Sequence, residues 1–595
     1  MSNLTIARLL ITSFAIVACE RAGPTKPAPP LATKITIDPS SITLNEIGQT
    51  IQLTAEVKDQ YDQLMRLTVY WSSNYPLVAV VDSSGLVTAR QIGTATITAR
   101  TGSVSTSANI KVRGPAFAAY ITQATQSLAR PVPLIAGEPA LLRVFFFDES
   151  VFNTIPPVRA SFFHDGNLSH TIDIAGNGAS VSPETGEGSL LTSANALLPD
   201  WVIVPGLEMS IEIDPDGTRI STAGGSYRIP DRGTMAVDVK EVPRFDLTVV
   251  PILNPENPDE EVIATTNGLT ADSDLFWQTR DLLPIGEFNV TVREPFWTTL
   301  EPVWENRFPL FLEIDMIRRM DGVGGYYMGM MRIRGAAQNP GFVTLINLLP
   351  WNIVHELGHN LSLGHAPCGT ADFLDPDYPY DDATTGAWGY DIRTNRLVSP
   401  RVLDLMSYCE GRWISDYNFT KALDYRLSDP IRRKAALPIP RKALLLWGGM
   451  NVGGELVLEP AFVVNASPSL PENTGPYKLE GRDVIGRSLF SMNFDMDWTA
   501  HGDGTFVFTL PVQPGWANQL SRITLSGPFG TTSIDGNEGR SAILLLDPAT
   551  GKVRGILRDR IRQSQNNVSE RYVLPEPGLE LVTSRGIPEL SAWRR

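Results

Sequence analysis

The segment HELGHNLSLGH, residues 355–365, constrains the fold of this chain more than any other stretch. Each residue of an α-helix advances by about 100°, so His355 and His359 lie on one face. Two imidazoles at this spacing can reach one metal ion, and Glu356 projects beside them. On a straight helix His365 would lie well away from that face. His365 can therefore join the site only if the helix ends between His359 and His365.

The break in this helix is predicted at Gly364, because glycine tolerates the left-handed conformation that ends helices. A catalytic zinc takes three protein ligands and keeps a position for water, so we expect one Zn²⁺ on His355, His359 and His365. Glu356 would accept the proton of the bound water as general base. If His365 did not reach the ion, a carboxylate would replace it. The candidates are Asp372, Asp375 and Asp377.

The segment resembles the long zinc motif of the metzincin peptidases, HExxHxxGxxH, except that Ser362 stands at its glycine position. The stretch DLMSYC (404–409) resembles the methionine turn of that clan. The resemblance implies that Met406 forms an apolar floor under the histidines and that Tyr408 stabilises the oxyanion of the reaction. It also implies that substrate adds to an edge strand above the zinc helix, for which FVTLI (342–346) is the candidate.

Two features bring the chain closer to the secreted, mucin-degrading M66 peptidases: a β-rich region before the zinc motif, and HELGHN with Gly-His at the motif's end. This resemblance implies a zinc endopeptidase that hydrolyses peptide bonds of extracellular proteins or glycoproteins. One alternative is a surface adhesion or binding protein with an inactive metzincin domain. Another is a zinc hydrolase that acts on bonds other than peptides.

The first residues favour export. The apolar run from Leu9 to Ala18 is too short to span a bilayer and fits the core of a signal peptide. Small residues before Cys19 resemble a bacterial lipoprotein signal, in which Cys19 becomes the lipidated first residue; an ordinary signal peptide is the alternative. We expect a signal at residues 1–19, a proline-rich tether at 20–32, and a lipid anchor holding the protein at the bacterial cell envelope or surface.

Cysteine usage agrees with export. With Cys19 lipidated, Cys368 and Cys409 remain as an even pair, and a disulfide between them is expected. Two buried free thiols are the alternative. The disulfide would tie the loop after His365 to the methionine turn and make both more rigid.

The chain is acidic, with a net charge of −15 and a pI of about 5.0. Binding to nucleic acid is therefore not expected, since it needs clustered lysine and arginine. Acids concentrate in DPDYPYDDATTGAWGYD (375–391), where they could line the cleft or bind Ca²⁺. An ordinary solvated loop is the alternative reading of this segment.

Hydrophobic periodicity divides the chain. In residues 33–113 apolar and polar residues alternate, which is the period of half-buried strands. This region resembles the bacterial Ig-like (group 2) domains in its stretches WSSN and VDSSGLVTARQIGTATITAR. Residues 114–243 predict a second β-sandwich. Residues 244–435 mix strands and helices, and residues 440–595 predict a β-rich C-terminal domain. The expected fold class is therefore multidomain, with an α/β metzincin-like catalytic domain flanked by all-β sandwich domains.

Overall fold

The computed structural model describes residues 29–558 and 576–594 apart from short gaps, which are residues 46–47, 77, 91–92, 113–116, 148–151, 182–185, 218–226, 323, 370, 372, 410, 429–438, 472–473 and 537–540. The predicted signal peptide with Cys19 lies outside the described residues, as does Asp372. The described chain forms two compact units, one within residues 29–111 and one from Val112 onward. No helix among the described residues is long and apolar enough to cross a membrane.

The expected fold class is wrong. Strands make up 44% of the chain and helices only 14%, so the protein is mostly β and is built from many separate sheets. Two local features explain the error. Residues 271–283, where the apolar pattern of the α/β region favours a helix, form only a 3₁₀ turn and the short helix α2 (Trp277–Leu282). Between the zinc helix and α5 (Asp416–Leu427), only the short strands β28 (Trp388–Asp391) and β29 (Arg396–Val398) are regular.

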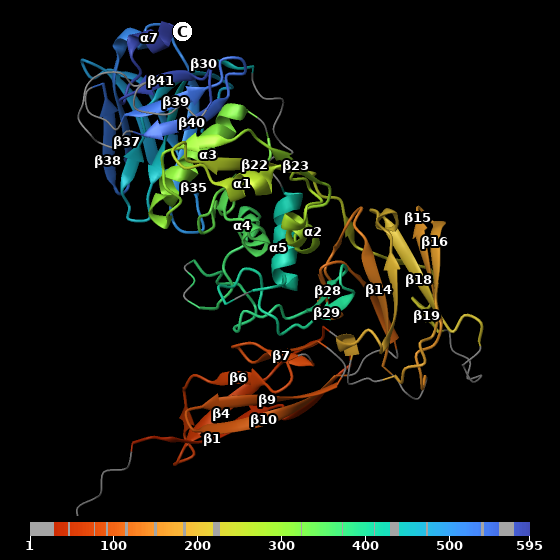
Figure 1. Ribbon diagram of the computed structural model, residues 1–595. Coiled ribbons are helices and arrows are strands. Elements are labelled where there is room, and N and C mark those ends of the chain that lie inside the picture. The colour runs from red at the N-terminus through yellow and green to blue at the C-terminus, as the bar shows by residue number, and fades with distance from the viewer. Residues whose placement is uncertain are drawn as a thin grey trace, which may run out of the picture. The chain divides into compact units, whose positions relative to one another are not determined.

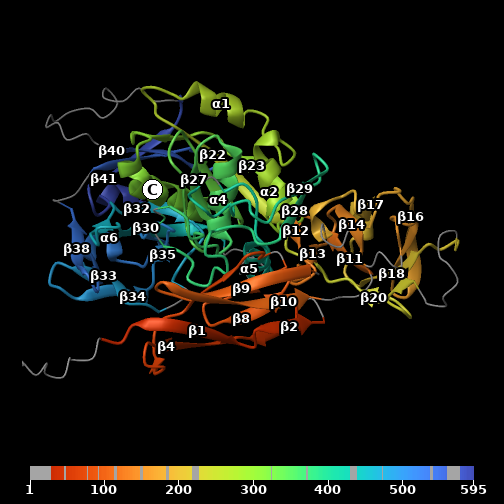
Figure 2. The same ribbon diagram turned by 90° about the horizontal axis from the view of Figure 1, so that it is seen from below.

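The first unit is built from three small sheets. Burial alternates along its strands, as in β9, where Ala95, Ile97 and Ala99 face inward. Figure 2 shows β1 beside β4 and β9 beside β10. The sheets, in strand order, are β1 (Ala32–Asp38), β4 (Thr54–Asp59) and β5 (Leu64–Met65); β2 (Ser41–Leu44), β10 (Val104–Val112), β9 (Gly93–Thr101) and β6 (Tyr70–Ser73); and β3 (Thr50–Gln52), β8 (Leu86–Ala89) and β7 (Ala79–Val81).

The second unit begins with two sheets that enclose one apolar core between residues 117 and 240. Every residue of β14 is buried, which matches the continuous apolar sequence ALLRVFF. The sheets are β11 (Phe117–Thr122), β14 (Ala140–Phe146) and β17 (Ser193–Leu198); and β16 (Asn167–Ile174), β15 (Val158–His164), β18 (Leu207–Ile213) and β19 (Arg228–Ile229), with β20 (Met235–Ala236) also paired to β18. A further pair joins β12 (Thr125–Gln126) to β28.

A mixed nine-stranded sheet forms the centre of the second unit. β22 lies beside β23 in both general views (Figures 1 and 2). The strand order is β26 (Ala336–Ala337), β27 (Val343–Ile346), β25 (Tyr326–Met330), β22 (Phe245–Leu253), β24 (Phe296–Thr298), β40 (Val553–Arg558), β39 (Ala542–Leu546) and β41 (Glu580–Ser584), with β23 (Phe288–Val292) also paired to β22. Strands from the region 440–595 thus extend the sheet that carries the zinc helix.

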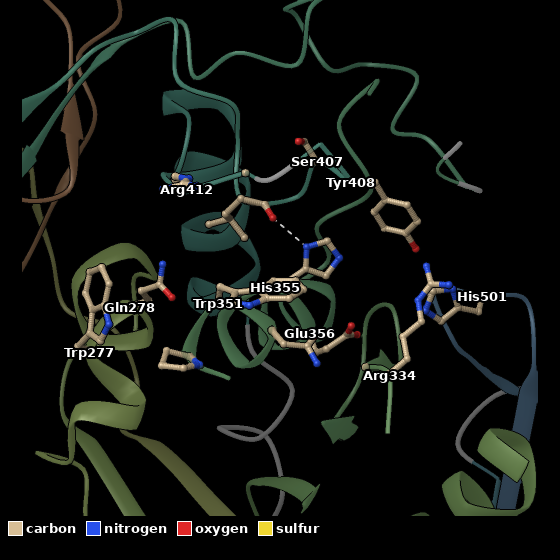
Figure 3. A pocket seen from close by; sticks show the side chains of 15 residues that line it. Trp277, Gln278, Arg334, Trp351, His355, Glu356, Ser407, Tyr408, Arg412 and His501 are labelled. Atoms are coloured by element: carbon tan, nitrogen blue, oxygen red, sulfur yellow. Dashed lines mark hydrogen bonds between the residues drawn. The ribbon is translucent and has the colours of Figure 1, made fainter. Parts of the chain in front are cut away.

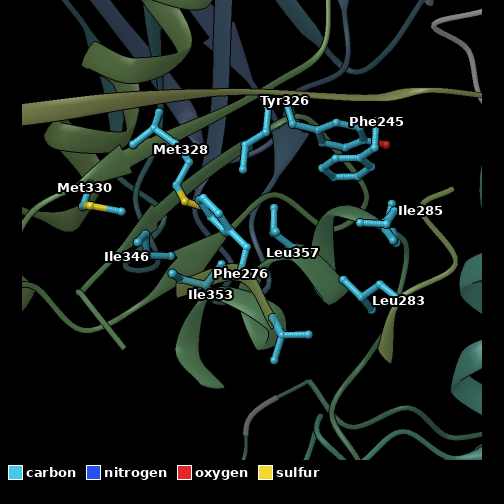
Figure 4. Close-up of a cluster of buried hydrophobic side chains, with 14 of the residues drawn as sticks. Phe245, Phe276, Leu283, Ile285, Tyr326, Met328, Met330, Ile346, Ile353 and Leu357 are labelled. Atoms are coloured by element: carbon cyan, nitrogen blue, oxygen red, sulfur yellow. The ribbon is translucent and has the colours of Figure 1, made fainter. Parts of the chain in front are cut away.

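Helices pack against this sheet through two large apolar clusters. α3 (Arg307–Asp321) buries ten residues, most of them in one cluster. α4 (Pro350–Asn360) joins the other through Ile353, Val354 and Leu357. Figure 4 shows Ile353 and Leu357 beside Met328 and Phe276 in this cluster. The segment HELGH (355–359) therefore sits on a helix whose opposite face is fixed by the core.

Residues from 441 onward also form two sheets of their own around a separate core. They are β31 (Leu456–Leu458), β30 (Arg441–Met450), β36 (Gly504–Pro511) and β35 (Asp497–Trp498), with β32 (Phe462–Ala466) also paired to β30; and β34 (Ser488–Phe494), β33 (Tyr477–Asp483), β37 (Leu520–Gly527) and β38 (Gly530–Asp535). The turn after β35 reaches the central sheet, because Ala500 N–H donates to the carbonyl of Ala337 at 2.8 Å.

Candidate metal centre

Helix α4 begins at Pro350, whose fixed φ and missing N–H suit the first position of a helix. His355, Glu356 and His359 follow on this helix, and all three are buried. The helix ends at Asn360, five residues before His365. The predicted break is therefore present, but it does not occur at Gly364.

Ser362 provides the break. Its φ is 72°, in the left-handed region, whereas Gly364 does not adopt a positive φ. The turn is closed by Ser362 N–H, which donates to the carbonyl of His359 at 2.9 Å, and by Leu363 N–H, which donates to the carbonyl of Gly358 at 3.1 Å. A serine thus takes the conformation for which the metzincin motif uses glycine. Gly364 has another role, since a Cβ there would lie 3.0 Å from the Cβ of Asp375.

The turn brings the three histidines together. Their candidate ligand atoms all lie within 4.8 Å of one another, and Nε2 of His359 is 3.0 Å from Nε2 of His365. Nδ1 of His355 faces the carbonyl of Leu405 at 2.8 Å, and Nδ1 of His359 faces that of Leu363 at 2.8 Å. Each Nδ1–H can donate to its carbonyl, which leaves Nε2 of both rings to bind a metal ion.

The electrostatic setting also fits a metal ion. Burial lowers the pKa of His355 to about 4 and lowers that of His359 well below its usual value. The rings are therefore neutral, as metal binding requires. Three buried imidazoles with no carboxylate in the set match the ligands of a catalytic zinc.

The alternative carboxylate ligands are engaged elsewhere or lie outside the described residues. Oδ2 of Asp375 accepts from Lys421 Nζ at 2.6 Å and from the Tyr417 hydroxyl at 3.1 Å. Neither Asp375 nor Asp377 belongs to a group of potential metal ligands in the described part of the chain. The same holds for the other acids of the 375–391 loop, so nothing in the described structure supports a calcium site there.

The methionine turn packs directly beneath the zinc helix. Met406 is fully buried, and a Cβ added to Gly358 would lie 2.8 Å from its sulfur. The buried carboxylate of Asp404 shapes the turn, because it accepts from Met406 N–H at 2.7 Å and from Ser415 N–H at 2.8 Å. A glycine in the helix and an aspartate in the turn thus set the distance between the two motifs.

Tyr408 and the disulfide follow this turn. The ring of Tyr408 lies edge-on to that of His365, with centroids 4.6 Å apart, and lines the cavity in front of the histidines. Cys368 and Cys409 are bonded, which confirms the predicted disulfide. The loop after His365 is therefore covalently joined to the residue next to Tyr408.

Glu356 faces the same cavity. Its Oε2 is buried and has no hydrogen-bond partner among the described residues. Burial raises its pKa to about 8, and the charge of Arg334 acts in the opposite direction. Gly335 leaves the space for this carboxylate, because a Cβ at that position would lie 2.2 Å from Oε1 of Glu356. A buried carboxylate with one free oxygen beside three histidines is suited to exchange a proton with a water molecule there.

The cavity has a volume of about 800 Å³, within the range of ligand-binding pockets. Figure 3 shows His355, Glu356 and Tyr408 together with Arg334 and His501. The lining residues are Trp277, Gln278, Arg334, Gly335, Pro350, Trp351, Asn352, His355, Glu356, Leu405, Ser407, Tyr408, Gly411, Arg412 and His501. Sequence reasoning did not find Arg334 or His501. No spacing rule connects them to the zinc motif, and His501 comes from the C-terminal region.

The expected edge strand is not at an edge. β27, which contains most of residues 342–346, pairs with β25 on one side and with β26 on the other. β26 is the outer strand, and the segment 498–500 covers part of it through hydrogen bonds to Ala337 and Asn339. Strand addition to β27 by a substrate is therefore blocked.

Comparison with known families identifies two domains. The family model "Bacterial Ig-like domain (group 2)" matches residues 31–112, and "Peptidase M66" matches residues 321–418. Both resemblances predicted from the sequence are confirmed to this extent. The Peptidase M66 match includes the zinc helix, the three histidines and the methionine turn, and it ends before His501. This match supports the interpretation of the domain as a protease.

Similarity to whole proteins is slight. A search of curated proteins found no match. Domains 4 and 5 of the S-layer protein SbsC are 23% identical, with a TM-score of 0.14, over 15% of this chain and 55% of that chain. Domains 5–6 of SbsC are 17% identical, with a TM-score of 0.14, over 36% of this chain and 99% of that chain. An intimin mutant of EHEC O157:H7 is 21% identical, with a TM-score of 0.11, over 16% and 54%. This chain thus spans just over half of the first SbsC fragment.

The conformation of Ser362 yields a paired prediction. Ser362→Gly removes a left-handed strain of about 1–2 kcal/mol and adds a smaller chain-entropy cost of about 0.5–1 kcal/mol. We expect this variant to unfold at the same temperature as wild type or higher. Ser362→Val should unfold earlier, because a β-branched residue is a poor fit to this φ. Thermal unfolding and zinc titration would measure both effects, and weaker zinc binding by the glycine variant would contradict this account.

The disulfide yields a second prediction. It joins residues 41 positions apart, so replacing both cysteines with serine should lower the free energy of unfolding by roughly 2–4 kcal/mol. Denaturation of the double variant would measure the loss. Wild type treated with dithiothreitol should show the same loss, and the double variant should not respond to the reductant. An unchanged unfolding midpoint in the double variant would contradict the prediction.

Proposed function

We propose that the protein is a zinc endopeptidase that hydrolyses peptide bonds in extracellular proteins or glycoproteins. One observation carries the proposal: a turn at Ser362 closes three histidines into one group beside Glu356, whose Oε2 has no hydrogen-bond partner among the described residues, and His355 and Glu356 line a cavity of about 800 Å³. The Peptidase M66 match over this segment supports the same reaction. The resemblance to metzincins is limited to the zinc motif and the methionine turn, and it does not extend to the fold.

His355, His359 and His365 would hold the ion. A zinc ion bound there would polarise the substrate carbonyl and make a water molecule a stronger acid. Glu356 would take the proton of the attacking water and deliver it to the leaving amine, for which its freedom from other partners suits it. Tyr408 would donate to the oxygen on which negative charge develops. Leu405 and Leu363 would keep the first two rings in the correct tautomer through their carbonyls.

We further propose that the protein acts at the bacterial cell surface, anchored through Cys19. The Ig-like domain is typical of surface proteins, and the disulfide fits an oxidising compartment. The proline-rich tether of residues 20–32 would hold the folded units away from the membrane. No nucleic acid is expected as a partner, in view of the net charge of −15.

A surface binding protein with an inactive domain is the second candidate. It would have no need of Glu356, nor of the space that Gly335 leaves for this side chain. Both are present, and this favours the enzyme.

The test compares wild type with Glu356→Ala, using Glu261→Ala on the exposed start of α1 (Glu260–Thr266) as a matched control. Zinc content is measured after dialysis, and cleavage of denatured casein and of a mucin is followed. We expect both variants to bind zinc, and Glu356→Ala to lose about 10²–10⁴-fold in rate. Zinc-loaded wild type that cleaves neither substrate would refute the peptidase proposal, and wild type without zinc would refute the metal site.

Gly335→Ala tests the fit of the carboxylate. Its Cβ would lie 2.2 Å from Oε1 of Glu356 and 2.6 Å from Oδ1 of Asn352, so Glu356 must shift. A displacement of this size can lower the rate by about 100-fold. We expect this loss in kcat/KM with zinc content unchanged. Gly536→Ala is the control, because no atom lies within 4 Å of its added Cβ. Full activity of Gly335→Ala would show that the placement of Glu356 is not critical.

A further inference from the structure

One wall of the cavity is lined by Arg334 and His501, which both pack against Trp304 behind it, and neither belongs to the group of potential metal ligands. Cζ of Arg334 lies 5.1 Å from the centre of the Trp304 ring and 5.5 Å from that of Tyr408. The His501 ring meets Trp304 edge-on at 5.1 Å and lies 6.2 Å from the ring of His365. Figure 3 shows the Tyr408 hydroxyl pointing toward Arg334 and His501.

The turn that carries His501 is held in place from several sides. Oγ1 of Thr499 accepts from the N–H groups of His501 and Asp503 at 3.3 and 3.1 Å. Asp503 forms an ion pair with Arg307 of α3 at 3.0 Å. Ala500 is hydrogen-bonded to β26, as described above. His501 is therefore fixed relative to the zinc helix before any substrate arrives, which lowers the entropic cost of binding.

Nε2 of His501 and the guanidinium of Arg334 form no hydrogen bond among the described residues, although Arg334 lies over two aromatic rings. Nε2 of His501 is buried without a hydrogen bond among the described residues. The guanidinium of Arg334 is exposed, and within the described chain it makes no hydrogen bond and no ion pair. Glu356 is the only carboxylate among the described residues that line the cavity. A buried donor without a partner is costly unless a ligand satisfies it, and a guanidinium is geometrically suited to a carboxylate.

We propose that Arg334 and His501 form a subsite for a carboxylate of the substrate, immediately beside the reaction centre. This inference rests on the proposed peptidase function and adds the substrate class, which is peptides with an acidic residue next to or near the cleaved bond. Arg334 would pair with the carboxylate, and Nε2 of His501 would donate one hydrogen bond to it. Tyr408 lies between this wall and His365, so the acidic residue must be close to the scissile carbonyl.

The proposal is tested first with a proteome-derived peptide library, in which the cut sites are mapped by mass spectrometry. Wild type should show Asp and Glu enriched at one position near the cleaved bond. Synthetic peptides with Glu or Gln at this position are then compared for kcat and KM. We expect wild type to prefer Glu by roughly 10- to 100-fold in kcat/KM, mainly through KM. Arg334→Gln should cleave the Glu and Gln peptides with equal kcat/KM, and His501→Ala should reduce the preference.

The matched control is Arg332→Gln. Arg332 is two residues away, does not line the cavity, and pairs with Asp259 at 2.5 Å. It should keep the full preference. Binding of both peptides is also measured to Glu356→Ala, with and without Arg334→Gln, because this readout does not depend on turnover. In Glu356→Ala the Glu peptide should bind more tightly than the Gln peptide by the same factor as in kcat/KM. Adding Arg334→Gln should remove this difference in Kd. Each peptide is also made with an amidated C-terminus, which separates a side-chain carboxylate from a terminal one.

Several outcomes would overturn the subsite. One is equal cleavage of the Glu and Gln peptides by wild type, and another is a preference for Glu that survives Arg334→Gln. A third is an equal loss of kcat on both peptides in that variant, because this would place Arg334 at the oxyanion instead. In all of these cases peptides are still cleaved by wild type, so the proposed function stands. Failure of wild type to cleave any peptide would instead refute the proposed function.

Discussion

The metal centre depends on one reversal of the backbone. α4 can present only His355 and His359 on a common face, and the third histidine arrives because Ser362 adopts a left-handed conformation directly after the helix. The reversed segment is then held on both sides. Asp375 N–H donates to the carbonyl of His365 at 2.9 Å, and Ala366 N–H donates to the carbonyl of Met406 at 3.1 Å. The cost of a strained serine is offset by this network and by the disulfide that follows it.

Burial gives the centre its chemistry. The three histidines lie in the protein interior, where a charged imidazole is disfavoured and neutral ligand atoms are retained. The same burial raises the pKa of Glu356 and leaves one of its oxygens without a partner. Backbone carbonyls hold the ring tautomers, and Gly335 and Gly358 admit the carboxylate and the methionine sulfur by having no side chain. The close packing around the site therefore depends on residues that carry no reactive group, namely these two glycines.

Local patterns in the sequence predicted much of this site and little of the surrounding fold. Helical spacing predicted that His355, Glu356 and His359 share one helix, and the need for a turn before His365 followed from the same angles. Cysteine counting predicted the disulfide. The position of the turn was wrong because glycine was preferred to serine for a positive φ, whereas tertiary contacts can hold a serine there. The fold class was wrong because apolar patterns alone could not reveal how short α2 would be or how irregular residues 361–415 are.

The residues that were missed share one physical property: long-range pairing brings them to the site. β40 joins β24 through Trp297 and Gly555, and the turn at 499–503 joins β26, so the region after residue 440 is continuous with the sheet behind the zinc helix. No local periodicity encodes such contacts. His501 therefore reaches the cavity from a part of the chain far from the zinc motif. In the proposed enzyme, this residue of the substrate subsite and the residues that perform the reaction come from different parts of the chain.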